Sequence, residues 1–165
     1  MAKKQAAAGG STPATVLLGK LGIPFEIRAY QHDPSVTDFG NEAAEALGVD
    51  PAQIFKTLLA EADGQLVVGI VPVAGQLDLK ALAAAVGARK AVMANPALAE
   101  KKTGYVVGGI SPIGQRTKLR TVLDETALEL STVLVSGGRR GLDIEIAPAD
   151  LKRATDASTA NIARS

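Results

Sequence analysis

Lys56 is the residue whose surroundings most directly suggest chemistry. It lies in segment 54–60 (IFKTLLA), whose apolar character and alternation predict a β-strand. The alternation places Lys56 on the same face as Ile54 and Leu58, where an ammonium group is costly unless it has a partner. A lysine in a partly dry site can anchor an anion or a carbonyl group. The commoner alternative is a surface lysine whose stem lies along apolar neighbours, and both interpretations stay open at this point.

Ser136 is a candidate nucleophile or ligand-binding hydroxyl, because it ends an apolar segment and precedes two glycines. A hairpin end explains the same residues equally well. A Ser-His-Asp triad would need His32, the single histidine of the chain, and no spacing places it near Ser136. Asp143 lies alone in an apolar segment and is expected at the same end as Ser136, unless it pairs with Arg139 or Arg140.

The segment 103–115 (TGYVVGGISPIGQ) is unusual, since it holds four glycines and a proline among apolar residues. Such a segment brings bare backbone close to a ligand or to another strand. The spacing of Gly109 and Gly114 matches a phosphate-binding Walker A loop, but Gln115-Arg116 replaces the required Lys-Ser/Thr pair. Pro112 also removes a backbone donor. The pattern therefore argues against a nucleotide hydrolase.

Composition excludes several classes of site. The chain of 165 residues has no cysteine and one histidine, which excludes a cysteine nucleophile, disulfides and zinc sites built from several Cys or His ligands. Aromatic residues make up only 3%, so a base-stacking platform for single-stranded nucleic acid is not expected. We expect a protein with no metal and no other cofactor.

The N-terminal residues carry no apolar run long enough for a signal peptide or a membrane span. We expect a disordered tail over residues 1–11, one domain over residues 12–165, and a cytoplasmic location without membrane contact.

Charge is segregated along the chain although the net charge is only +1. Residues 26–78 hold nine acids and two bases, whereas residues 80–120 hold eight bases and one acid. A basic region of this size can form a face for phosphate groups. The alternative is a set of solvated helix faces.

Caps and periodicity predict a series of short elements. Helices are expected at 13–21, 41–47, 79–86 and 96–102 and from residue 148, and strands at 25–30, 54–61, 65–71, 121–123, 132–136 and 142–146. Asp63-Gly64 is a strong hairpin signal between two of these strands. The order of elements predicts one compact α+β domain with a mixed sheet.

Five blocks of the sequence resemble one family. They are 30–40 (YQHDPSVTDFG), 55–59 (FKTLL), 72–80 (PVAGQLDLK), 103–115 and 135–146 (VSGGRRGLDIEI). Together they resemble the bacterial YbaK/EbsC proteins, stand-alone relatives of the editing domain of bacterial prolyl-tRNA synthetases. The resemblance covers nearly the whole chain after residue 11. It implies a twisted, barrel-like mixed β-sheet flanked by helices.

The resemblance also implies a set of site residues. The essential lysine of the family falls on Lys56, and the backbone thought to approach the aminoacyl ester falls on Gly108 and Gly109. The residues expected to bind the substrate are Tyr30, Phe39, Thr57, Ser111, Pro112, Ser136 and Asp143. The charge pattern adds expected tRNA contacts at Lys101, Lys102, Arg116 and Lys118. The family is thought to need no metal.

The implied activity is removal of cysteine from mischarged proline tRNA, with prolyl-tRNA synthetase as a transient partner. Cysteine is about as bulky as proline, and a size difference of one methylene discriminates only roughly 10–200-fold, so a second site must discard the product. In this branch of the family the cysteine thiol is thought to attack its own ester. The alternatives are a non-catalytic module that binds aminoacyl-tRNA or the synthetase, and an alanine-specific deacylase of the same fold.

Overall fold

The structure is a computed structural model, and it describes residues 11–165. The expected tail lies outside the described residues except for Ser11. The helices are α2 (Pro13–Leu21), α3 (Phe39–Leu47), α4 (Leu79–Ala85), α5 (Pro96–Thr103), the 3-10 helix η1 (Glu125–Glu129) and α6 (Pro148–Thr155). The strands are β1 (Glu26–Ala29), β2 (Phe55–Ala62), β3 (Gln65–Pro72), β4 (Gln76–Leu77), β5 (Ala91–Met93), β6 (Arg120–Asp124), β7 (Val133–Arg139), β8 (Leu142–Ile146), β9 (Ser158–Ala160) and β10 (Ala163–Arg164).

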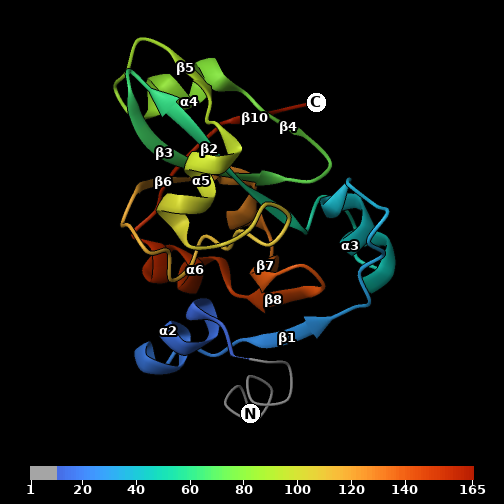
Figure 1. Cartoon of the computed structure of the whole chain (residues 1–165). Helices are drawn as coiled ribbons and strands as arrows, with labels where there is room; N and C mark the ends of the chain where they lie inside the picture. Colours follow the sequence, from blue (N-terminus) through green and yellow to red (C-terminus); the bar gives the residue numbers. More distant parts are fainter. Residues whose placement is uncertain (1–10) are drawn as a thin grey trace.

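Within the described residues the strands form three sheets. A five-stranded mixed sheet has the order β5-β2-β3-β6-β9, a three-stranded sheet has the order β1-β8-β7, and β10 pairs with β4. The two larger sheets meet where the Leu134 amide donates to the Gln53 carbonyl at 3.0 Å, just before β2. Helices α2 and α6 lie beside the three-stranded sheet at one end, and α4 and β5 lie at the other end (Figure 1). The predicted single α+β domain is confirmed, and its sheets stay open at the edges instead of closing into a barrel.

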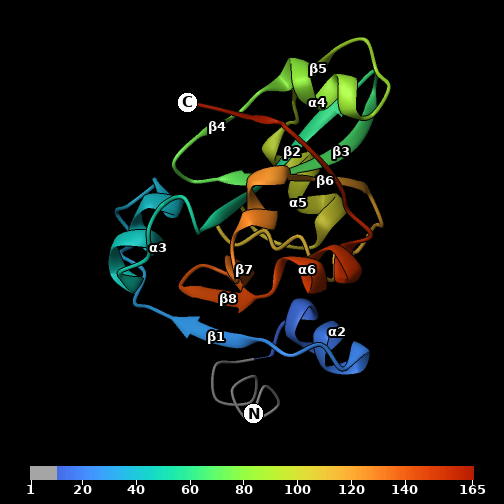
Figure 2. The same cartoon turned by 180° about the vertical axis from the view of Figure 1, so that it is seen from behind.

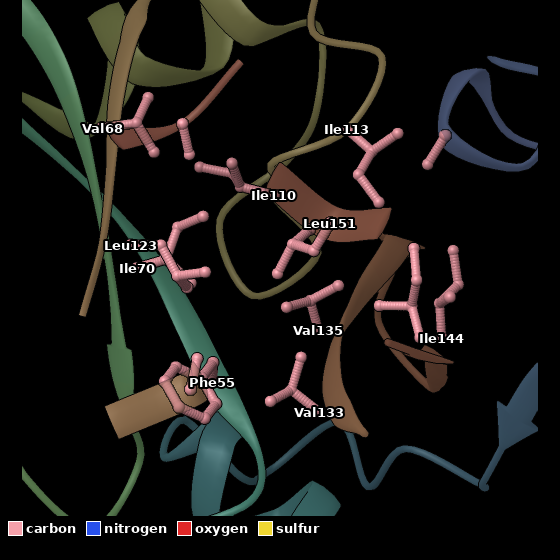
Figure 3. Close-up of a cluster of buried hydrophobic side chains, with 14 of the residues drawn as sticks. Phe55, Val68, Ile70, Ile110, Ile113, Leu123, Val133, Val135, Ile144 and Leu151 are labelled. Atoms are coloured by element: carbon pink, nitrogen blue, oxygen red, sulfur yellow. The ribbon is translucent and has the colours of Figure 1, made fainter. Parts of the chain in front are cut away.

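The main core fills the space between the two larger sheets. Phe55, Ile70 and Leu123 of the five-stranded sheet face Val135 and Ile144 of the three-stranded sheet (Figure 3). Neighbouring residues of a strand point to opposite faces. Because Ile144 is buried in this core, the side chain of the preceding residue, Asp143, points away from the core.

Most predicted element boundaries agree with those in the structure, and local hydrogen bonds and backbone angles explain why. The Thr12 hydroxyl accepts from the Thr15 amide at 3.2 Å and so caps α2, which starts at Pro13. Asp63 and Gly64 both have positive φ angles, 49° and 82°, as the predicted tight hairpin requires. Helix α3 starts at Phe39, two residues earlier than expected. The strands β4, β5, β9 and β10 were not predicted.

Asp124 fastens the C-terminal segment to the sheet. Its side chain is fully buried, and one carboxylate oxygen accepts from the amides of Ile162 and Ala163 at 3.0 Å each. The other oxygen accepts from the hydroxyl and the amide of Thr126. The red C-terminal segment consequently runs along the five-stranded sheet, adding β9 to its edge beside β6 before β10 pairs with β4 (Figure 2).

We predict that Asp124→Ala lowers the free energy of unfolding by roughly 2–4 kcal/mol, because it leaves buried amides without an acceptor. Denaturant unfolding would measure the loss. Glu129→Ala, which removes an exposed carboxylate nearby, is the control and should change stability little. Equal stability of the Asp124 variant and the control would show that the carboxylate does not hold the C-terminal segment.

Candidate active site

A cavity of about 340 Å³ lies where β2 begins, beside the start of α3, the glycine-rich loop and the adjoining ends of β7 and β8. This volume falls in the range that binds small ligands. Seven of the residues expected at the site line it: Tyr30, Phe39, Lys56, Thr57, Gly108, Ser136 and Asp143. Gly109, Ser111 and Pro112 do not line it.

Lys56 is partly buried in the cavity wall. No described side chain forms an ion pair or a hydrogen bond with its ammonium group; the ion pairs of residues 11–165 join Arg28 to Glu145, His32 to Glu42 and Lys118 to Asp156. An uncompensated cation facing a cavity is available to a negatively charged or strongly polarised ligand atom.

Thr57 lines the same cavity and carries a second unsatisfied group. Its hydroxyl oxygen is shielded from solvent, and among the described residues it is the one buried side-chain polar atom without a hydrogen-bond partner. Such atoms are rare in folded proteins, because burial without a partner costs free energy. Because this oxygen is shielded, a ligand can become its partner only if the side chains around it adjust when the ligand binds.

Asp143 lies in the middle of a row of polar side chains across the three-stranded sheet. It is paired with Arg28 on β1 and with Ser136 on β7, so the three side chains share one face. Its side chain is 7% exposed, and this burial raises the pKa of its carboxyl to about 7, although the charge of Arg28 acts in the opposite direction. Arg28 is itself bound to Glu145.

Tyr30 follows the end of β1, two residues beyond Arg28, and lines the same cavity. Burial and the nearby carboxylate of Asp143 raise the pKa of its phenol to about 12. The hydroxyl of Tyr30 therefore stays protonated at neutral pH and can donate a hydrogen bond into the cavity.

Gly108 and Gly109 have different surroundings. Gly108 lines the cavity with a φ angle of +88°, and a Cβ atom there would lie 2.9 Å from the ring of Phe39. Gly109 packs on the backbone of the β7–β8 turn, where a Cβ atom would lie 2.7 Å from the Cα of Arg139. The Gly109 amide donates to the Val106 carbonyl at 2.8 Å. It is therefore engaged within the loop, and Gly108 is the glycine that faces the cavity.

Ser111 and Pro112 lie behind the cavity wall and are buried. The Ser111 hydroxyl accepts from the Ile113 amide at 3.2 Å, and the Ser111 carbonyl accepts from the side chain of Gln115 at 2.9 Å. These bonds shape the loop and leave Ser111 no contact with the cavity.

Two contacts clamp the glycine-rich loop beside Gly108. The Val107 amide donates to the carboxylate of Glu100 at 2.8 Å, and its carbonyl accepts from Nε of Arg140 at 2.8 Å. The guanidinium carbon of Arg140 lies 4.8 Å from the centre of the Phe39 ring, a cation–π contact. The loop, the β7–β8 turn and the start of α3 are therefore tied together at the cavity mouth.

No triad forms at Ser136. Nδ1 of His32 lies 2.7 Å from the carboxylate of Glu42, and the His32 ring lies beside Phe39. The Ser136 hydroxyl accepts from the Gly138 amide at 3.2 Å. Asp143 is the cross-strand neighbour of Ser136, but within residues 11–165 no hydrogen bond joins the Ser136 hydroxyl to Asp143 or to His32, so no base is aligned to activate it as a nucleophile.

The basic residues expected to contact tRNA lie away from the cavity lining. Lys101 and Lys102 lie in the last turn of α5, and the guanidinium of Arg116 donates to the Lys101 carbonyl at 3.3 Å. Lys118 pairs with Asp156 in an exposed contact, which contributes little to stability.

Among the residues at the cavity that sequence reasoning missed, three carry charged or sulfur-containing side chains. Asp38 and Met93 line it, and Arg140 braces its wall from outside. Arg140 lies within the block at 135–146, whereas Met93 lies on β5, a strand too short to show a pattern. In the described part of the chain no group of three or more His, Asp or Glu side chains could hold a metal ion.

Comparisons with known proteins agree with this geometry. The model of the aminoacyl-tRNA editing domain family matches residues 33–154. The chain belongs to this family. The match confirms the resemblance drawn from the five sequence blocks, and the function of the chain is aminoacyl-tRNA editing by deacylation.

Relatives of this editing domain include one of Enterococcus faecalis named "Putative Cys-tRNA(Pro)/Cys-tRNA(Cys) deacylase EbsC". It is 41% identical over 120 residues, which is 72% of this chain and 73% of that protein. A proline–tRNA ligase of Moorella thermoacetica is 37% identical over 73 residues, 44% of this chain but only 13% of the ligase. A crystal structure of "a putative trans-editing enzyme for prolyl tRNA synthetase" superposes with a TM-score of 0.81 at 27% identity, covering 93% of this chain and 96% of the other.

None of the helices between residues 11 and 165 combines the length and the apolar character that a membrane crossing requires.

We predict that the carboxyl of Asp143 makes stability depend on pH. Its pKa is about 7 in the folded protein against an ordinary value of 3.8, so between these pH values the folded protein binds the proton more tightly than the unfolded chain. The free energy of unfolding therefore falls as pH rises through this window. Asp143→Asn keeps a neutral side chain and should melt several degrees higher than the parent at pH 8, with a smaller difference at pH 5 that disappears below the unfolded pKa of 3.8.

Thermal melts across this pH range, with the exposed Glu129→Gln as the control for net charge, would measure the effect. A variant that melts lower than the parent at pH 8 would show that the charge of Arg28 outweighs burial and stabilises the ionised carboxylate.

Proposed function

We propose that this editing domain removes cysteine from mischarged proline tRNA, with the thiol of the substrate as the nucleophile. One observation carries the proposal. The cation Lys56 has no partner among the described residues, and it lines a cavity in which no described side chain is set up as a nucleophile. A catalyst of this kind orients a reactive substrate and stabilises the charge that develops, and supplies no covalent partner of its own.

The cavity residues divide the work in the proposed reaction. The thiol sulfur attacks the carbonyl carbon of the ester, and the bond from that carbon to the terminal ribose oxygen breaks. The thiol proton passes to the carboxylate of Asp143 and from there to the leaving oxygen. The products are a cyclic thiolactone and uncharged tRNA, so atoms and charges balance. A carboxyl group with a pKa of about 7 is well matched to accepting and returning a proton at neutral pH.

Lys56 and Gly108 stabilise the carbonyl oxygen as it becomes negative. The ammonium of Lys56 has no competing partner among the described residues, and the backbone of Gly108 lines the same cavity. The Thr57 hydroxyl, which lacks a partner, and the Tyr30 phenol are the groups that hold the substrate. Gly109 packs the loop in place, since its amide is already bonded.

Proline tRNA is the proposed carrier because the relatives named above include a protein named for Cys-tRNA(Pro) and part of a proline–tRNA ligase. Contacts to the body of the tRNA are proposed at Lys101, Lys102, Arg116 and Lys118. A transient complex with prolyl-tRNA synthetase is part of the same proposal.

We predict that Lys56→Ala lowers the deacylation rate by roughly 10²–10³-fold while the protein stays folded, because one oxyanion contact is lost. Lys20→Ala, which removes an exposed lysine of α2, should leave the rate unchanged. Single-turnover deacylation of Cys-charged proline tRNA and a thermal melt of each variant would be compared. A folded Lys56→Ala variant with the rate of the parent would remove Lys56 from the mechanism.

We predict that Cys-charged proline tRNA is cleared much faster than the same tRNA charged with serine or alanine. A hydroxyl is a far weaker nucleophile than a thiol, and the methyl group of alanine is none. Mass spectrometry of the quenched reaction should detect the thiolactone at least transiently.

The same assay separates the alternatives. Faster release of alanine than of cysteine would identify an alanine-specific deacylase, and an acyl adduct on Ser136 would replace the thiol mechanism by ordinary nucleophilic catalysis. Binding of charged tRNA without any release would identify a non-catalytic module.

A further inference from the structure

Arg140 lies in the turn between β7 and β8, directly outside the cavity wall. Its Nε atom donates to the Val107 carbonyl at 2.8 Å, and its guanidinium carbon lies 4.8 Å from the centre of the Phe39 ring. Val107 and Phe39 both line the cavity. The guanidinium is therefore separated from the cavity only by the residues it contacts.

The two contacts use only part of the guanidinium. They occupy one N–H group and one face of the plane, and the side chain is exposed. Among the described residues no carboxylate pairs with Arg140 and its terminal nitrogens have no acceptor, whereas Arg28, also near the cavity, is bound to Glu145. Arg140 thus holds free donors at the cavity mouth.

The bonded and stacked position also fixes the orientation of these donors before any ligand arrives. A guanidinium is planar and offers parallel N–H groups that match two oxygens of a phosphate group. A side chain that is already ordered loses less entropy on binding, so its contacts contribute more to affinity. Asp38, the exposed acid at the same mouth, accepts from the side chain of Asn41 at 2.7 Å.

We propose that Arg140 binds the phosphodiester group next to the terminal adenosine of the tRNA, while the aminoacyl ester attached to that adenosine lies in the cavity. The inference rests on the proposed function, which places the ester beside Lys56. Lys56 then contacts the carbonyl oxygen of the ester, and Arg140 contacts the nearest phosphate. The two cations thus hold the end of the tRNA on both sides of the terminal ribose. The site lies outside the basic region at 80–120.

Two stable probes test this assignment. One is adenosine with cysteine joined to its 3′ position through an amide, and the other is the same compound with a 5′-phosphate. The parent protein should bind the phosphorylated probe roughly tenfold or more tightly, as expected for a charge-assisted pair of hydrogen bonds. Arg140→Gln should abolish this preference, so that the two probes bind equally, whatever affinity both lose because the brace on Phe39 and Val107 is removed.

Control variants isolate the phosphate contact. Arg153→Gln removes an exposed arginine of α6 and the same unit of charge, and it should keep the full preference. Arg140→Lys keeps the charge without the paired donors and should keep only part of the preference. If Arg140→Gln proves unstable in a thermal melt, the partial loss of preference in Arg140→Lys tests the phosphate contact in its place.

Each other result overturns the proposal. Equal weakening of both probes by Arg140→Gln would show that Arg140 only braces Phe39 and Val107. An unchanged preference would place the phosphate contact elsewhere, and a parent protein without any preference would exclude a phosphate site. Deacylation of Cys-charged tRNA by the parent is measured separately, so failure of the phosphate site is distinguishable from failure of the proposed function.

Discussion

The close packing of the glycine-rich loop on the β7–β8 turn is the constraint on which the rest of the site depends. Gly109 lies against the backbone of that turn, where a Cβ atom would come within 2.7–2.9 Å of backbone atoms that cannot yield easily. This contact brings Gly108 to the cavity and places Arg140 where it can reach the Val107 carbonyl and the Phe39 ring. A bulkier residue at position 109 would separate the loop from the turn, and the cavity wall would lose both its backbone surface and its brace.

The cavity collects groups that a core built only for stability would avoid. Lys56 has no partner among the described residues, the Thr57 hydroxyl is buried and unsatisfied, and Asp143 is buried with a raised pKa. Each of these arrangements costs free energy in the empty protein. The well-packed core between the two larger sheets offsets that cost and keeps the groups in position (Figure 3). A ligand that provides partners for all three groups binds more tightly, because the free-energy cost of leaving them without partners is removed when it binds.

Much of the fold follows from local signals that can be recognised in the sequence. Thr12 with Pro13 and the pair Asp63-Gly64 mark elements whose backbone chemistry is complete within a few residues, and these predictions are confirmed. The strands β4, β5, β9 and β10 hold only two or three residues each, which is too short for a period to show, so only tertiary pairing defines them. The prediction that Lys56 and Ser136 lie at one site rested on the family resemblance. The row of Arg28, Asp143 and Ser136 depends on strand register, which no single segment encodes.

In the proposed mechanism, selectivity arises from the chemistry of the substrate more than from its size. Proline and cysteine differ too little in volume for a cavity of this kind to separate them well by fit alone. Proline, however, carries no side-chain nucleophile, so its ester would remain intact in a cavity that provides orientation and charge stabilisation but no attacking group. The same cavity would let a cysteine ester react with its own thiol. An activated Ser136 would remove this distinction, because it would attack the two esters alike. The Ser136 hydroxyl is bonded to the Gly138 amide, and among the described residues no hydrogen bond joins it to Asp143, its cross-strand neighbour, or to His32. This arrangement fits a site in which activation of Ser136 would be harmful.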